Sequence, residues 1–121
     1  LRERGDDLDQ ATCELAWTNC VKGVRRFRHR WDGMLRASER GERYHPTQKP
    51  VALMSWILAL PWLPQSGLVF DPYAGSGPIG VACVRAQRDY MGVELSESYV
   101  AIARRRIAEA QAQTTLDLDV A

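Results

Sequence analysis

A chain of 121 residues, of which 45% are hydrophobic and 26% charged, is long enough for one small globular domain with a modest core. Its formal net charge of +1 excludes a strongly polyanionic or polycationic protein, and its longest apolar stretch, ending at Pro61, is too short to cross a bilayer. The three cysteines form an odd count without metal-binding spacing, which favours a reduced, cytoplasmic protein without a metal site.

Residues 1–44 are predicted to form a polar tail, a basic β-hairpin and a short loop. Residues 14–21 mix aromatic and β-branched side chains as strands do, and Lys22-Gly23 offers a tight turn. Residues 24–35 alternate imperfectly between apolar and basic side chains. The hairpin is therefore expected to pair residues 14–21 with residues 24–35.

Positive charge is concentrated in this hairpin and in the loop after it. Eight basic residues stand against three acidic ones between Lys22 and Arg43, so this segment carries a net charge of +5. Arginines next to Phe27 and Trp31 are able to bind a DNA backbone, but they also suit a charged sheet edge that resists aggregation. Both interpretations stay open for the arginines concerned, which are Arg25, Arg26, Arg28 and Arg30.

Residues 45–113 are predicted to form a helix followed by a strand–helix–strand–helix unit. In the first helix Thr47 is the expected N-cap, Pro50 lies in the first turn, and Pro61 marks the end. Short apolar strands each precede a helix, which is the pattern of a βαβ unit with a parallel sheet. The strands span 67–71 and 89–94, the helices span 78–87 and 96–113, and residues 114–121 form a tail.

A glycine-rich turn, Gly75-Ser76-Gly77, stands between the strand 67–71 and the helix that follows. Glycine lets the backbone turn sharply, and free N–H groups at a helix start favour an anionic group. Glu94 ends the next strand, 19 residues after Gly75, where nucleotide-binding βαβ units place an acid that binds ribose hydroxyls. The combination predicts a nucleotide-type cofactor, and a plain turn with a surface glutamate is the alternative.

These motifs together resemble one enzyme family. "DPYAGSG" (71–77) and "MGVEL" (91–95), preceded by "HPTQKP" (45–50), are similar to the cofactor half of a permuted, beta-group DNA amino-methyltransferase, which methylates adenine N6 or cytosine N4. The resemblance covers about residues 13–108, with Tyr73 in place of phenylalanine and Pro78 in place of threonine. It implies an α/β, Rossmann-like S-adenosylmethionine-dependent methyltransferase fold that is incomplete here.

The resemblance implies S-adenosylmethionine as the cofactor and assigns its contacts. Glu94 is expected on the ribose, and "HPTQKP" at the methionine end, where Lys49 or the Thr47 hydroxyl meets the carboxylate. Spacing alone would make that hexapeptide only a capped helix start. Leu95 is expected against the adenine or, alternatively, in the core. The implied cofactor contacts are His45, Thr47, Gln48, Lys49, Asp71, Tyr73, Ala74, Gly75, Ser76, Gly77, Glu94 and Leu95.

The Asp-Pro-Pro-Tyr type of motif, with which this family holds the target amine of a flipped base, is absent from the sequence. In the permuted order it is expected upstream of Leu1, together with the central strands of the sheet. The loop 32–44 stands where the family's target-recognition region lies. We therefore expect a piece that holds the methyl donor but lacks the means to transfer the methyl group alone.

The resulting expectation is part of a bacterial or phage-encoded DNA methyltransferase, with DNA as partner and without a membrane or metal. Strand 67–71 is apolar throughout, as a central strand is, and it would otherwise be left at an open edge. The chain is therefore expected to associate with a missing N-terminal part or a second copy, unless the hairpin covers the gap. Alternative functions are a non-catalytic nucleic-acid-binding or regulatory module and a methyltransferase for RNA or protein.

Overall fold

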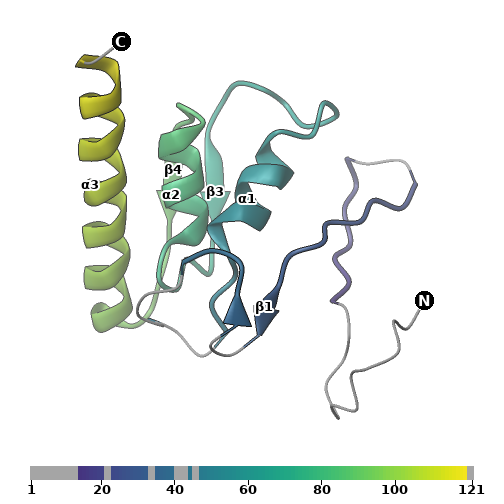
Figure 1. Cartoon of the computed structure of the whole chain (residues 1–121), viewed down its shortest axis with the longest axis horizontal. Coiled ribbons are helices and arrows are strands. Elements are labelled where there is room, and N and C mark those ends of the chain that lie inside the picture. Colours follow the sequence, from purple (N-terminus) through teal and green to yellow (C-terminus); the bar gives the residue numbers. More distant parts are fainter. Residues whose placement is uncertain (1–13, 21–22, 33–34, 40–43, 45–46, 120–121) are drawn as a thin grey trace.

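The computed structural model describes residues 14–20, 23–32, 35–39, 44 and 47–119 (Figure 1). Strands β1 (Trp31–Asp32) and β2 (Leu35–Arg36) form a small antiparallel pair. Strands β3 (Val69–Asp71) and β4 (Tyr90–Gly92) form a separate parallel pair. The helices are α1 (Val51–Leu58), α2 (Pro78–Arg85) and α3 (Glu97–Asp119).

The predicted βαβ unit is present as β3, α2 and β4. Val69 lies opposite Tyr90 and Asp71 lies opposite Gly92, and the ladder continues where the Val93 N–H donates to the Asp71 carbonyl at 2.8 Å. Helix α2 packs against both α1 and α3, so the three helices lie side by side with α2 in the middle (Figure 1). The fold of the described residues is therefore α/β, with a small parallel sheet.

The core lies between the three helices. Val51, at the start of α1, is buried against Val81 and Ala82 of α2. Burying each such side chain stabilises the fold by about 1–3 kcal/mol. Partly buried side chains from α1 and α3 complete the cluster, namely Met54, Leu58, Ile107 and Ala110. Helix α2 is thereby held in place on both sides, and the glycine turn at its N-terminus with it.

Helix α1 does not use Thr47 as its N-cap. Its N-cap is Pro50, which has no side-chain hydrogen bond to offer, and the Val51 N–H donates instead to a carboxylate oxygen of Glu39 at 2.7 Å. A residue before proline is disfavoured in the helical region, which keeps Lys49 out of the helix. Pro50 is itself extended, with a ψ of 138°, so it is the N-cap rather than part of the first turn. The helix ends at Leu58, before Pro61 as expected.

The predicted hairpin is wrong in its position. Residues 14–20 and 24–30 are not strands, and the antiparallel pairing occurs later, with the Ala37 N–H donating to the Arg30 carbonyl at 2.8 Å beside β1 and β2. The apolar side chains that alternate with arginines in residues 24–30 pack against a different element. The Phe27 ring lies 5.3 Å from that of Trp56 on α1, so these apolar residues pack on a helix rather than on a second strand.

The predicted tail is also wrong, because α3 continues to Asp119. No glycine or proline follows Gln113 to end the helix. The Gln113 amide donates to the Asp117 carboxylate at 3.0 Å, which is a stabilising contact between side chains one helical turn apart. Thr114 adds a bond from its hydroxyl to the Ala110 carbonyl at 3.0 Å.

Strand β3 pairs only with β4 among the described residues, and the β1–β2 pair does not cover its other edge. One face of the sheet is also bare. Phe70 and Met91 lie opposite each other in the register and are 56% and 53% exposed. Within the described residues, the strand that is expected to be covered on both faces therefore lies at an edge of the sheet and has one exposed face. In the described region, no helix has the length and hydrophobicity needed to span a membrane.

Candidate functional site

The structure brings the glycine turn and the acid after β4 into direct contact. One Glu94 carboxylate oxygen accepts a hydrogen bond from the Gly75 N–H at 2.9 Å, and the other accepts one from the Ser96 N–H at 2.9 Å. Gly75 and Gly77 have φ angles of 52° and 77°, in the left-handed region that favours glycine. The turn is therefore tight because of its glycines, and Glu94 fixes one of its amides.

Beside this turn lies a cavity of about 280 Å³. Three apolar side chains, Met54, Pro78 and Ile79, form part of its wall. A carboxylate next to an apolar wall suits a ligand that combines hydroxyl groups with a less polar body. Eight of the predicted cofactor contacts line this cavity: Thr47, Gln48, Lys49, Asp71, Tyr73, Gly75, Ser76 and Glu94.

Asp71 shapes the chain just before the turn. Its side chain is only 7% exposed, and one carboxylate oxygen accepts a hydrogen bond from the Tyr73 N–H at 3.1 Å. The Tyr90 hydroxyl donates to the other oxygen at 3.5 Å. Burial, followed by the neighbouring Asp71 charge, raises the pKa of Tyr90 above its ordinary value. Tyr90 therefore stays neutral beside the carboxylate, as a hydrogen-bond donor.

This shift of the Tyr90 pKa predicts a loss of stability in alkali. Above about pH 10 the unfolded chain releases the Tyr90 proton while the folded chain keeps it, so the free energy of unfolding falls as pH rises. Urea denaturation should show Tyr90→Phe to be about 0.5–1.5 kcal/mol less stable than wild type at pH 8. The difference should shrink between pH 10 and pH 11. A difference that stays constant across this range would contradict the assignment.

Of the predicted contacts that the structure describes, three do not line this cavity. Ala74 and Gly77 are buried and build the turn, where the Ala74 N–H donates to the Val93 carbonyl at 2.9 Å. Leu95 is fully exposed, so the alternative that it packs in the core is wrong. His45 lies outside the described residues. Leu95 remains a predicted cofactor contact.

Two predicted contacts line the cavity with their polar groups already engaged. The Lys49 ammonium pairs with the Glu14 carboxylate, and both side chains are partly or largely exposed. The Gln48 side chain is 6% exposed, and its amide bonds to Glu39, Tyr44 and Ser76. Gln48 thus ties "HPTQKP" to the glycine turn, while the exposed Lys49 pair can exchange partners at little cost.

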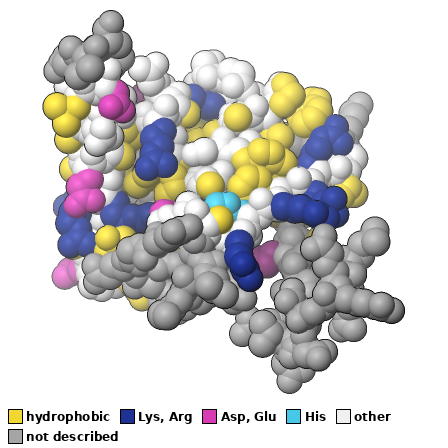
Figure 2. Space-filling view, viewed as in Figure 1, with side chains coloured by type: hydrophobic (Ala, Val, Ile, Leu, Met, Phe, Trp, Pro, Cys, Tyr) yellow, Lys and Arg dark blue, Asp and Glu magenta, His cyan; other side chains and the backbone are white. Residues whose placement is uncertain are grey.

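The arginines predicted to bind DNA are all exposed. They occur in an extended segment in which aromatic rings alternate with the arginines. The ring centroids of Phe27 and His29 lie 5.6 Å apart, and those of His29 and Trp31 lie 6.0 Å apart. The Arg25 guanidinium lies over the Trp62 ring at 4.5 Å. Figure 2 shows Lys and Arg side chains in separate groups with hydrophobic ones between them. The segment thus presents arginines to solvent without one continuous basic groove on that face.

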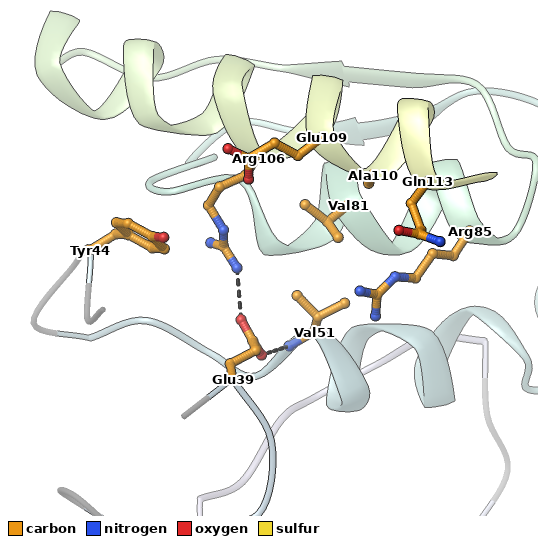
Figure 3. Close-up of a pocket in the computed structure, with 9 residues that line it drawn as sticks. All are labelled: Glu39, Tyr44, Val51, Val81, Arg85, Arg106, Glu109, Ala110 and Gln113. Atoms are coloured by element: carbon orange, nitrogen blue, oxygen red, sulfur yellow. Dashed lines mark hydrogen bonds and ion pairs between the residues drawn. The ribbon is translucent and has the colours of Figure 1, made fainter. Parts of the chain in front are cut away.

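A larger cavity, of about 370 Å³, lies between the helices and holds none of the predicted contacts (Figure 3). Glu39 and Arg106 meet there at 2.7 Å. Sequence reasoning missed both residues, although Arg106 carries a visible signal. It lies three residues after Ala103 and one before Ile107, on the apolar stripe of α3, where an arginine needs a buried partner. Glu39 gives no such signal, because it lies in an irregular segment.

The described residues include two cysteines and several carboxylates whose surroundings can be compared with metal and thiol sites. No three side chains of histidine, cysteine, aspartate or glutamate gather there as a metal site would require. Cys20 is exposed and Cys83 is buried, and both are free thiols. Burial raises the pKa of the Cys83 thiol, which keeps it protonated and unreactive at neutral pH.

Comparison with known proteins matches the sequence of this chain to DNA methylases. A family model described as DNA methylase, of the N6 and N4 type, matches residues 6–105. The type II methyltransferase M2.MboI of Moraxella bovis is 38% identical over 71 residues, which are 59% of this chain and 26% of that protein. YubD of Escherichia coli (strain K12), which carries the name of a methylase, is 39% identical over 71 residues, or 31% of its length.

Solved structures of M1.HpyAVI also resemble the chain. The M1.HpyAVI–SAM complex shares 38% sequence identity with a TM-score of 0.49, over 52% of this chain and 30% of that one. A second M1.HpyAVI structure shares 29% identity with a TM-score of 0.46, over 54% of this chain and 40% of that one. The matched region spans less than a third of each curated relative.

Proposed function

This chain belongs to the DNA methylase family, and we propose that it is the part of a DNA amino-methyltransferase that holds S-adenosylmethionine. The observation that carries the proposal is the contact of Glu94 with Gly75 at the edge of a cavity lined by eight expected cofactor contacts. In the whole enzyme, the methyl group would pass from the sulfonium to the amino nitrogen of adenine or cytosine. S-adenosylhomocysteine and a proton would be released.

Glu94 has capacity to bind a ribose in addition to its present partners. A carboxylate offers about four acceptor positions, and the N–H groups of Gly75 and Ser96 use two of them. The ribose hydroxyls would donate to the same carboxylate while these two N–H bonds hold the turn. Gly75, which has no side chain, would allow the nucleoside to approach its backbone closely.

The contribution of this chain to catalysis would be positioning. Methyl transfer requires the amine nitrogen in line with the sulfonium methyl, and holding both in place supplies most of what such a step needs. The sequence lacks the Asp-Pro-Pro-Tyr type of motif that would hold the target base. We therefore propose that the chain binds the methyl donor and requires another polypeptide segment for transfer.

Calorimetric titration of the purified 121-residue chain with S-adenosylhomocysteine tests this proposal. We expect saturable binding of one molecule per chain. Adenosine alone should bind more weakly, because it lacks the methionine end that "HPTQKP" is proposed to contact. A folded chain that shows no heat of binding and no thermal stabilisation at millimolar ligand would exclude the proposed cofactor role.

The exposed arginines of residues 24–30 are proposed to bind DNA phosphates. Changing Arg25, Arg26 and Arg28 to alanine should then flatten the slope of log affinity against log salt by up to about three units. The matched control removes the same charge elsewhere, by changing Arg85, Arg104 and Arg105, which are exposed on α2 and α3. An equal change of slope in both triple variants would refute a specific role for the extended segment.

We also propose that the bare β3–β4 face and the open edge of β3 are covered in the working protein. Phe70 and Met91 expose apolar surface, and backbone groups on the outer edge of β3 lack a partner strand in the described region. The occupant would be the methylase segment outside the matched region, since that region spans less than a third of the relatives.

In the absence of that segment, the purified chain should self-associate through this surface. Light scattering should give a mass above 13.7 kDa, and changing both Phe70 and Met91 to serine should lower it. Changing Leu15 and Trp17, which are more exposed and lie outside the sheet, should leave it unaltered. A well-folded wild-type monomer of 13.7 kDa would prove the proposed association wrong.

A further inference from the structure

Arg106 is a buried cation behind the glycine turn. It is 8% exposed, whereas Arg104 and Arg105 on the same helix are exposed. Its guanidinium donates to the Ser76 carbonyl at 2.8 Å and to the Ser76 hydroxyl at 3.0 Å. Figure 3 shows its other arm reaching Glu39, whose carboxylate lies 2.7 Å away. One side chain thus connects α3, the turn and the segment before α1.

Glu39 provides the charge that makes this burial possible. Its two carboxylate oxygens accept hydrogen bonds from Arg106 and from the Val51 N–H, at 2.7 Å each. Its φ angle of 51° lies in the left-handed region, which costs about 1–3 kcal/mol for a residue other than glycine. The strain persists because this backbone conformation places the carboxylate between Arg106 and the positive N-terminal end of α1.

Gln48 closes a ring of hydrogen bonds. Its amide N–H donates to Glu39 at 3.3 Å, while its amide oxygen accepts a bond from the Ser76 hydroxyl at 3.4 Å. The ring therefore runs from Arg106 through Ser76, Gln48 and Glu39 back to Arg106. Because three of its four members are buried, Glu39 is partly buried and the charges are paired, removal of one member leaves the others with unsatisfied groups.

We propose that Arg106 is a positioning residue for cofactor binding, which holds the Ser76 carbonyl and so fixes the backbone of the glycine turn. The inference rests on the proposed cofactor role of that turn. Glycine-containing segments have many accessible conformations, and a ligand that binds one of them loses affinity by the cost of ordering it. Arg106 holds the Ser76 carbonyl on one side of the turn, and Glu94 holds the Gly75 N–H on the other side. The binding conformation therefore exists before the cofactor binds.

The test compares Arg106→Met and Arg106→Lys with two controls. Arg106→Met should weaken S-adenosylhomocysteine binding at least about tenfold. Arg106→Lys should lose less affinity, because lysine keeps the positive charge but cannot make both hydrogen bonds to Ser76. Arg104→Met removes an exposed arginine and should bind like wild type. Val81→Ala destabilises the core at a site that does not line the proposed cofactor cavity, and should reduce the melting temperature more than the affinity.

Amide hydrogen exchange, which needs no ligand, separates this inference from the cofactor proposal. Exchange at Gly75 and Gly77 should accelerate in Arg106→Lys but not in Arg104→Met. A wild-type chain that fails to bind S-adenosylhomocysteine would exclude the cofactor proposal and, with it, the role in binding. The positioning role would be overturned if Arg106→Lys left the exchange rates at Gly75 and Gly77 unchanged. It would also be overturned if Arg106→Met, compared with Val81→Ala at equal stability, lost no more affinity than Val81→Ala does.

Glu39→Gln provides the second line of evidence and covers the case in which Arg106→Met does not fold. If Glu39 acts through Arg106, Glu39→Gln should weaken binding, and combining it with Arg106→Lys should weaken it by less than the product of the two single effects. Fully multiplicative effects would show that the two residues act independently, which would contradict the proposed ring.

Discussion

Replacing Glu94 with alanine should weaken S-adenosylhomocysteine binding by about 1.5–3 kcal/mol, which is a tenfold loss or more. The proposed ribose hydroxyls would lose a charged acceptor. The N–H groups of Gly75 and Ser96, now bonded to Glu94 at 2.9 Å each, would also lose their partner. The turn would keep the bonds from Arg106 to Ser76 and from Ala74 to Val93, but it would lose its contact with Glu94. Calorimetry on the folded variant measures the effect directly.

Two further variants separate these contributions. Glu94→Gln keeps an oxygen acceptor but removes the charge, and it should lose less affinity than alanine. Glu97→Ala removes a nearby acidic side chain that is exposed in the first turn of α3, and it should leave the affinity unchanged. If Glu94→Ala folds and binds as tightly as wild type, Glu94 does not hold the ribose.

The parts of this fold that were predictable are those that local sequence determines. The strand ending at Asp71, the glycine turn and the helix from Pro78 follow one another without interruption, and each is encoded by its own residues. Glu94 was found because a fixed spacing relates it to Gly75. The two lie side by side because parallel strands bring their carboxyl ends to one edge of the sheet.

The parts that were not predictable depend on partners far apart in the chain. Glu39 and Arg106 are 67 residues apart, and neither residue indicates the other by its spacing. The alternation around Phe27 was detected, but it was assigned to a second strand because a period of two does not specify what the apolar side packs against. Its partner is Trp56 on α1, and only tertiary packing determines that choice.

Gly77→Ala should be among the most destabilising small changes in this chain, at about 3 kcal/mol or more. Gly77 has a φ of 77°, so an alanine there is strained by about 1–2 kcal/mol whatever surrounds it. In addition, an added Cβ would lie 2.9 Å from the Ala103 Cβ and 3.1 Å from the Ala103 Cα. The Ala103 Cα is a backbone atom of α3, and the Ala103 Cβ is bonded directly to it, so neither can rotate away. The helix or the turn would therefore have to move.

Gly67→Ala is the control that isolates the backbone strain. Gly67 has a φ of 94°, but nothing lies within 4 Å of the position that its Cβ would take. Urea denaturation should therefore give a loss of about 1–2 kcal/mol for Gly67→Ala, without the steric part. Equal losses in the free energy of unfolding for Gly77→Ala and Gly67→Ala would show that a Cβ at residue 77 makes no steric clash with α3.

The same steric contact predicts partial rescue. Ala103→Gly removes the nearer of the two clashing atoms, at a cost of about 1 kcal/mol for a glycine within a helix. The double variant Gly77→Ala/Ala103→Gly should therefore be more stable than the sum of the two single losses predicts. If the proposed cofactor role of the turn holds, its S-adenosylhomocysteine affinity should recover with its stability, because Gly77 lies next to Ser76 and Gly75, whose N–H bonds to Glu94. Recovery of stability without recovery of affinity would mean that the cofactor does not depend on the position of this turn.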